Sequence, residues 1–357
     1  MAQGGGSRRA QIVGTGLLGG SVGLALRRAG WHVTGTDADP ATEARARELG
    51  AVDATGWDRD AEIAFVATPV RAIVGAAREA LDRTAGVVTD LGSVKASIAA
   101  TVDDPRFVGG HPMAGSEQLG VDGSDADLFG GAVWVLTPTD GTDPDRFATV
   151  DAVVRSLGAD VVALTPERHD ALVAVVSHVP HLTAAALMTL ADERASEHAA
   201  LLRLAAGGFR DMTRVAAGTP TIWPDICGEN RAAIVEVIDQ LRGELDRMRT
   251  LVEGDDHDGL LRVLERAQGA RRNLPSRVVD PSDVAEVRVP VLDRGGVIAE
   301  VSTLAAELGV NIADLEIAHS SEGDRGVLIL LVERERADTF RAGLVERGYH
   351  PTVAELR

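Results

Sequence analysis

Short apolar runs alternate with longer amphipathic stretches through the first part of the chain. This alternation is typical of βαβ units that build a parallel sheet. Helices are predicted at about Leu18–Ala29 and after Pro40. Seven strands are predicted, at 11–13, 32–36, 63–67, 87–89, 106–108, 133–136 and 160–164. The pattern therefore predicts a doubly wound α/β domain of the Rossmann type over residues 8–164.

Residues 165–273 change to long stretches with helical spacing, which predicts an all-α domain. In the clearest stretch, Arg231–Val252, one helical face is apolar. Its members are Ile234, Val237, Ile238, Leu241, Leu245, Met248 and Leu251. Such a face suits either a dimer interface or packing within the same domain, and the pattern alone does not separate the two.

One segment of this domain, Ala171–Ala191, holds no Asp, Glu, Lys or Arg and is long enough to span a bilayer. It also contains His178, Pro180 and His181, which would be costly in hydrocarbon. We therefore predict a helix buried inside the protein, and no membrane span.

The C-terminal part follows a stretch, 273–283, that has two prolines and no periodicity and is predicted to be a linker. Residues 284–357 then alternate between strand and helix patterns. The predicted strands are 285–291, 311–318, 326–333 and 349–354, and the predicted helices are 297–308 and 337–347. The order βαββαβ predicts a small α+β domain.

Charge and cysteine content narrow the function class. The 36 basic and 54 acidic residues give a formal net charge of -18, which repels nucleic acids. The one cysteine, Cys227, cannot form an internal disulfide, which fits a reducing compartment. The first ten residues lack the apolar core of a secretory signal. We expect a cytoplasmic protein with no nucleic-acid and no membrane partner.

A glycine-rich segment follows the first predicted strand and opens the first predicted helix. This context separates a dinucleotide-binding fingerprint from a chance match. Gly14 permits a tight turn, Gly16 lets the backbone approach a pyrophosphate, and Gly19 allows close helix packing. Free N–H groups at the helix start attract the phosphates. The predicted contacts in this loop are Gly14, Gly16, Leu17, Leu18 and Gly19.

The dinucleotide is predicted to be NAD. Asp37 ends the second strand, eighteen residues beyond Gly19, where its carboxylate can bind a ribose 2′-hydroxyl and repel a 2′-phosphate. Arg45 and Arg47 are close in sequence and would suit NADP, but we interpret them as a solvated helix face.

Three segments end strands on the ligand side of the predicted sheet: 68–69, 90–95 and 109–117. Thr68 and Pro69 are predicted to contact the cofactor. Ser93 by itself suits the N-cap of a helix that begins near Lys95. His111 is expected on a loop at this edge, where an imidazole can either be structural or take a proton from a substrate hydroxyl.

The helical domain adds two pairs of polar residues. His178 and His181 have the spacing of a metal pair, but the sequence supplies no third ligand beside them. Arg210 and Arg214 can offer guanidinium groups to a carboxylate substrate, with ion pairing to Asp211 or Asp225 as the alternative. No metal site is predicted.

The motifs taken together resemble the prephenate dehydrogenase family. They are GTGLLGGS at 14–21, DLGSVK at 90–95, GHPMAGSE at 110–117, VSHVPH at 176–181, FRDMTR at 209–214 and WPDI at 223–226. The tail resembles an ACT domain, an amino-acid sensor, on DRGGVI at 293–298 and GVNI at 309–312. The resemblance covers nearly the whole chain.

The resemblance implies NAD-dependent oxidative decarboxylation of prephenate in tyrosine biosynthesis, by a homodimer. His111 would accept the proton of the 4-hydroxyl, and Ser93 would orient it. Arg214 would bind a substrate carboxylate and His181 would stand near the side chain. Ser116 and Glu117 would line the cleft. Since few residues precede Gly14, we expect no fused chorismate mutase domain and a monofunctional enzyme.

The ACT resemblance implies a regulatory site at Gly296, Asn311 and Ile312, with tyrosine as the expected effector. The loop departs from the family pattern at Gly295, where a proline is common, so amino-acid binding there stays open.

The sequence leaves three alternative functions open. Arogenate dehydrogenase acts on the amino-acid analogue of the same ring, and Glu117 or Asp170 could bind its ammonium group. A non-catalytic sensor of NAD and an amino acid would not need His111. A generic 3-hydroxyacid dehydrogenase would usually lack the tail.

Overall fold

The computed structural model describes residues 7–115, 118, 120–195, 201–273, 284–292, 294–319 and 325–355. The chain forms two compact units. The first comprises Met1–Ser196 with Thr213–Glu244, and the second Glu197–Met212 with Leu245–Arg357. The boundaries 8–164, 165–273 and 284–357 stay a prediction, and the predicted linker lies almost entirely outside the described residues.

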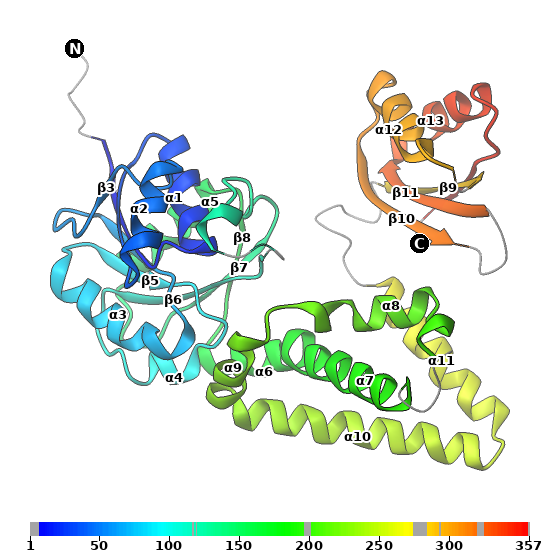
Figure 1. Ribbon diagram of the computed structural model, residues 1–357, viewed down its shortest axis with the longest axis horizontal. Coiled ribbons are helices and arrows are strands. Elements are labelled where there is room, and N and C mark those ends of the chain that lie inside the picture. Colours follow the sequence, from blue (N-terminus) through cyan, green and yellow to red (C-terminus); the bar gives the residue numbers. More distant parts are fainter. Residues whose placement is uncertain are drawn as a thin grey trace. The chain divides into compact units, whose positions relative to one another are not determined.

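The first unit contains an eight-stranded sheet in the order β3-β2-β1-β4-β5-β6-β7-β8 (Figure 1). Its strands are β1 (Arg9–Val13), β2 (His32–Thr36), β3 (Ala54–Thr55), β4 (Ile63–Val66), β5 (Val87–Asp90), β6 (Phe107–Pro112), β7 (Val133–Thr137) and β8 (Asp160–Ala163). The predicted Rossmann-type fold is confirmed. The count of seven strands was one short, because β3 has only two residues and leaves no pattern. The sheet is also not wholly parallel, since β7 pairs antiparallel with β6.

Helices cover both faces of this sheet. Alternate strand residues point to opposite faces, so Ile12 and Phe65 join one core while Val13 and Val66 join the other. The first core is closed by α1 (Leu17–Arg28), α2 (Pro40–Glu48) and α5 (Pro144–Ser156), and the second by α3 (Val70–Arg83) and α4 (Ala96–Ala99). Local sequence sets the starts of α2 and α5, where Asp39 and Asp143 cap backbone N–H groups just before a proline.

The helical part begins with a continuous run, Pro166–Ala195, made of α6 (Pro166–Val173), a π-helical turn η2 (Ala174–His178) and α7 (Val179–Ala195). By length and composition the run is apolar enough to cross a membrane. The prediction of a buried helix was wrong, because only 28% of its apolar window is buried in this chain. Exposed apolar side chains on it are Leu172, Val175, Val176 and Leu190.

The helices that follow are α8 (Gly207–Thr213), α9 (Trp223–Glu229), α10 (Arg231–Glu253) and α11 (His257–Arg272), with 3-10 turns η4 (Arg214–Ala217) and η5 (Pro220–Ile222) before α9. The apolar face predicted on α10 is buried in its first half and exposed at Leu245. Ile234, Val237, Ile238 and Leu241 pack with Ala174 and Val179 of the same unit. Leu245 is 55% exposed. The first half of the face therefore packs within its own domain.

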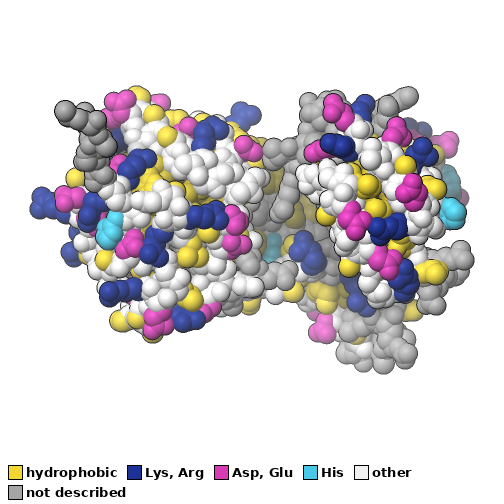
Figure 2. All heavy atoms as spheres, turned by 90° about the horizontal axis from the view of Figure 1, so that it is seen from above, with side chains coloured by type: hydrophobic (Ala, Val, Ile, Leu, Met, Phe, Trp, Pro, Cys, Tyr) yellow, Lys and Arg dark blue, Asp and Glu magenta, His cyan; other side chains and the backbone are white. Residues whose placement is uncertain are grey.

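The C-terminal part forms a four-stranded antiparallel sheet in the order β10-β11-β9-β12. Its elements are β9 (Val284–Leu292), α12 (Val297–Glu307), β10 (Ile312–His319), β11 (Arg325–Glu333), α13 (Arg334–Glu346) and β12 (Thr352–Glu355). One face of the sheet packs on both helices around Val301, Leu330 and Phe340. The predicted βαββαβ domain is confirmed, and this topology is consistent with the ACT resemblance. In the space-filling view of the whole chain (Figure 2), acidic and basic side chains are interspersed on the visible surface.

Candidate active site

The glycine loop between β1 and α1 has the shape that a dinucleotide needs. Gly14 adopts φ 90°, and a Cβ there would lie 2.6 Å from the carbonyl oxygen of Ala67. A Cβ on Gly19 would overlap the carbonyl oxygen of Gly14. Gly16 differs, because a Cβ there would meet no protein atom within 4 Å. The protein itself requires the first and third glycines, whereas the second leaves open space at the N-terminus of α1, where free N–H groups can bind an anion.

Two more predicted cofactor residues border this loop. The carboxylate of Asp37 accepts hydrogen bonds from the backbone N–H groups of Thr15 (2.7 Å) and Asp39 (3.0 Å), which fix it at the end of β2. The Thr68 hydroxyl is buried without a hydrogen-bond partner among the described residues, so a bound dinucleotide can supply one. Pro69 is the residue before α3. Arg45 pairs with Asp122 at 2.7 Å, as a surface side chain would.

His111 was expected on a loop, but it lies within β6 and is 9% exposed. The loop was predicted because two glycines precede His111. In the structure both are strand residues with no room for a side chain: a Cβ on Gly109 would overlap the Thr137 hydroxyl, and one on Gly110 would lie 2.7 Å from the carbonyl oxygen of Asp90. His111 still stands near the carboxyl end of its strand, where ligands of such sheets bind.

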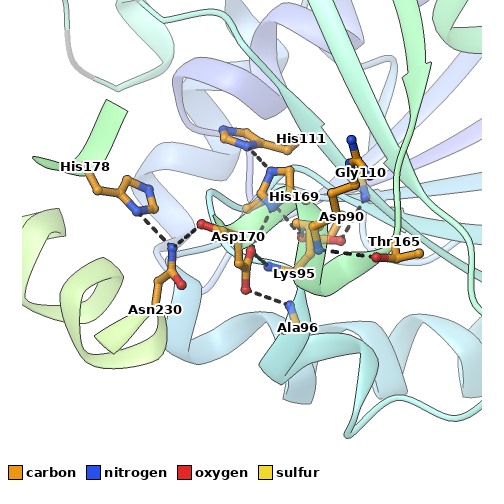
Figure 3. Close-up of polar contacts among 12 residues, drawn as sticks. Asp90, Lys95, Ala96, Gly110, His111, Thr165, His169, Asp170, His178 and Asn230 are labelled. Carbon is orange, nitrogen blue, oxygen red and sulfur yellow. Dashed lines mark hydrogen bonds and ion pairs between the residues drawn. The ribbon is translucent and has the colours of Figure 1, made fainter. Parts of the chain in front are cut away.

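The imidazole of His111 is linked to the helical run (Figure 3). Its Nδ1 lies 2.8 Å from Nε2 of His169, and Nδ1 of His169 lies 2.7 Å from Oδ1 of Asp170. The Asp170 carboxylate also accepts the backbone N–H groups of Lys95 (2.8 Å) and Ala96 (2.9 Å). His111 of β6 and His169 and Asp170 of α6 therefore form one hydrogen-bonded series.

Burial lowers the pKa of His111 well below its ordinary value. Next in order of influence, His169, Lys95 and His178 lower this pKa further, because positive charge nearby disfavours the imidazolium. Lys95 forms a buried ion pair with Asp90, and burial lowers the lysine pKa. The site thus holds a neutral imidazole at neutral pH.

Ser93 does not have either predicted contact. The helix α4 begins at Ala96 with Lys95 as its N-cap, so the prediction of Ser93 as N-cap was wrong. The Asp170 carboxylate binds the N–H groups that such a cap would serve. Within the described part of the chain, the hydrogen-bond partner of the His111 ring is His169, and no hydrogen bond joins the ring to Ser93.

Asn230 connects Asp170 to a second group of side-chain rings, which consists of His178, His181 and Trp223. The Asn230 amide donates to the carbonyl oxygen of Asp170 (2.8 Å) and lies 3.2 Å from Nδ1 of His178. Trp223 contacts His178 edge-on and stacks on His181 with ring centroids 3.6 Å apart. Burial lowers the pKa of His178 to about 4. Sequence reasoning missed His169 and Asn230, since neither lies in a recognised motif.

Of the remaining predicted site residues, some are described by the structure and others are not. Arg214 is exposed on η4, which packs against α7, the helix that bears His181. Asp225 pairs with Arg71 at 2.9 Å, and Arg210 donates to the carbonyl oxygen of Ala205. The predicted cleft residues, Ser116 and Glu117, lie outside the described residues. Within the described ranges no three His, Cys, Asp or Glu side chains gather as metal ligands.

A glycine loop at the first strand, an acid at the second and a buried imidazole near the carboxyl end of β6 define an NAD-dependent dehydrogenase. Comparison with known families gives the finer assignment. Residues 22–163 match the nucleotide-binding domain of prephenate dehydrogenase, and residues 165–266 match its dimerization domain. The chain belongs to the prephenate dehydrogenase family, whose members are NAD-dependent oxidoreductases.

Individual relatives agree. The chain is 32% identical over 335 residues to prephenate dehydrogenase of Bacillus subtilis, covering 89% of this chain and 90% of that one. The crystal structure of prephenate dehydrogenase from A. aeolicus with hydroxyphenyl propionate and NAD+ is 31% identical, with a TM-score of 0.70, over 75% of this chain and 99% of that one. Arogenate dehydrogenase from Synechocystis is 33% identical, with a TM-score of 0.65, over 74% and 98%.

Proposed function

We propose that this chain catalyses the oxidation and decarboxylation of prephenate to 4-hydroxyphenylpyruvate in tyrosine biosynthesis, with NAD as oxidant. The observation that carries the proposal is the buried His111 near the carboxyl end of β6. Its Nδ1 is engaged by His169, so Nε2 is the ring nitrogen left for a substrate. The family assignment and the names of the relatives support this choice of reaction.

Each part of the chain has a defined task in this reaction. Nε2 of His111 takes the proton of the 4-hydroxyl, which develops into a carbonyl; a well-placed imidazole contributes roughly 10²- to 10⁴-fold. NAD, when bound, accepts the hydride from C4. The bond to the ring carboxylate then breaks and CO2 leaves. The electron pair of that bond makes the ring aromatic and leaves a phenolate oxygen on C4, which takes back the proton held by His111. The open space at Gly16 and the carboxylate of Asp37 fit the pyrophosphate and the ribose.

Substrate recognition is assigned to the helical part. Arg214 would pair with a substrate carboxylate, since an arginine matches a carboxylate bidentately. His181, held flat against Trp223, would contact the substrate side chain. We also assign cleft positions to Ser116 and Glu117 from their motif.

Arogenate is the alternative substrate, and one of its two candidate partners loses support. Asp170 is buried, with 4% of the residue exposed. Its carboxylate already contacts the backbone N–H groups of Lys95 and Ala96 and the ring of His169, so it is not available to an ammonium group. Glu117 remains as a candidate. The likeness to an arogenate dehydrogenase keeps this substrate in the test.

The test is NADH formation in separate incubations with prephenate and with arogenate, together with release of CO2. We expect NADH and CO2 in equal amounts with prephenate. Turnover of arogenate alone would retain the chemistry and change the substrate. Absence of NADH with both, in folded protein that binds NAD, would overturn the proposal in favour of a sensor.

We further propose a cytoplasmic homodimer. The match to a dimerization domain supports it, as does the exposed apolar surface of the run Pro166–Ala195, which a second copy would cover. Light scattering should give twice the chain mass of 37.4 kDa, and a single-chain mass at micromolar concentration would contradict it.

Tyrosine is proposed as the effector of the C-terminal domain. The loop at its expected site has Gly296 at φ 92°, before α12, with Asn311 exposed and Ile312 at the start of β10. Tyrosine should inhibit the intact chain and not a chain that ends near Val279. An equal response of both would exclude the domain as the receptor.

A further inference from the structure

We propose that His169 and Asp170 are positioning residues that fix the tautomer of His111, so that Nε2 of His111 is always a proton acceptor. The use of that acceptor in catalysis rests on the proposed function. The tautomer itself does not, because it follows from hydrogen-bond partners within the protein.

The argument starts at the Asp170 carboxylate. Its oxygens lie 2.8 Å from the backbone nitrogen of Lys95 and 2.9 Å from that of Ala96. A backbone N–H can only donate, so both oxygens act as acceptors, and two donated hydrogen bonds favour the carboxylate over the carboxylic acid. With a carboxylate as acceptor, the remaining contact, 2.7 Å to Nδ1 of His169, is a hydrogen bond donated by the imidazole. Asp170 therefore fixes the proton of His169 on Nδ1.

The next contact follows from this assignment. A neutral imidazole that carries its proton on Nδ1 has a lone pair on Nε2. Nε2 of His169 lies 2.8 Å from Nδ1 of His111, where two lone pairs would repel each other. His111 therefore donates from Nδ1. Its own lone pair is then on Nε2, the nitrogen that the substrate would meet.

The surroundings hold this arrangement in place. His169 is 0% exposed and Asp170 is 4% exposed, so water does not compete for their hydrogen bonds. Asn230 donates to the carbonyl oxygen of Asp170 at 2.8 Å, which helps to hold the backbone of Asp170 in place. The other protonation state, an imidazolium at His169, would reverse the tautomer of His111, and the measurement below separates the two.

The first test is the 15N NMR spectrum of the histidine side chains in the full-length protein near pH 7.5. We expect His111 and His169 each to carry one proton, on Nδ1, with an unprotonated Nε2. A proton on Nε2 of His111, or on both nitrogens of His169, would overturn the proposal. This test does not depend on activity, so it stands even if neither substrate is turned over.

The second test compares two substitutions at one position. His169→Phe removes the acceptor for the His111 proton, and we expect kcat to fall by on the order of 100-fold with little change in KM or in NAD affinity. His169→Gln places an amide oxygen near the former Nε2, so it should retain at least tenfold more kcat than the Phe variant. Equal kcat of both variants and wild type would contradict the proposal, as would equal loss in both.

A matched control is available in the same unit. His32 is half-buried, and its Nδ1 lies 3.7 Å from Asp53, so it is also a histidine beside an aspartate. It is at the opposite end of its strand from Asp37. His32→Gln should leave kcat unchanged. If His169→Phe fails to fold, the NMR spectrum of the wild type decides.

Discussion

Nδ1 of His111 lies 2.8 Å from Nε2 of His169, although 58 positions separate the two residues in the chain. His111 belongs to the nucleotide-binding sheet, and His169 belongs to the first helix of the helical part. The catalytic base that we propose in the sheet is therefore hydrogen-bonded to a helix that follows the sheet in the chain. The residues of the nucleotide-binding sheet therefore form only part of the candidate site, and His169 and Asp170 of α6 form the rest of the hydrogen-bonded series.

The low pKa of His111 predicts the pH dependence of turnover. A base with a pKa well below 6.5 stays unprotonated, and so active, at pH values where an ordinary histidine is protonated. We expect kcat/KM for prephenate to stay level from pH 8 down to 6.5 and to fall only at lower pH. An acidic limb with its midpoint at or above 6.5 would contradict the assignment.

His178 predicts a pH dependence of stability. Its pKa is about 4 in the folded protein and 6.5 in the unfolded chain, so between these values the unfolded state binds more protons. The contribution is fully present above pH 6.5 and is lost as the pH falls toward 4. Between pH 7.5 and 5 the free energy of unfolding in urea should fall more in wild type than in His178→Asn, by on the order of 1 kcal/mol. Equal slopes would remove His178 as the cause.

Gly16 and Gly19 should respond differently to substitution by alanine. Gly16→Ala adds a methyl group into open space, so stability should be retained while the affinity for NAD falls, because the methyl group occupies the space for the pyrophosphate. Gly19→Ala would overlap the carbonyl oxygen of Gly14, so it should destabilise the fold itself. Thermal unfolding and NAD titration of both variants give the comparison. Unchanged NAD affinity in Gly16→Ala would argue against the proposed pyrophosphate position.

Most of the fold could be predicted because buried parallel strands are short apolar runs that stand out between helices. The failures have local causes. Two residues cannot form a pattern, so β3 was missed. Gly109 and Gly110 suggested a loop, but they are strand residues that make room for Thr137 and Asp90.

The site was less predictable than the fold. His111 stood out in its glycine-rich motif, whereas His169 sits in a helix with no local sign of function, and Asp170 was considered only as a partner of the arogenate ammonium group. His169 and His178 are nine residues apart, about two and a half turns of α-helix, which would place them on opposite faces. The π-helical turn at 174–178 lies between them, and both side chains are buried. Sequence periodicity does not reveal such a turn.

The most direct test of the central claim is the initial rate of NADH formation from prephenate by wild type and by His111→Asn. The asparagine amide can still donate to His169, but it offers no acceptor where Nε2 stood. We predict a rate at least about 100-fold lower with NAD affinity nearly unchanged. An unchanged rate would contradict the account and remove His111 from the mechanism.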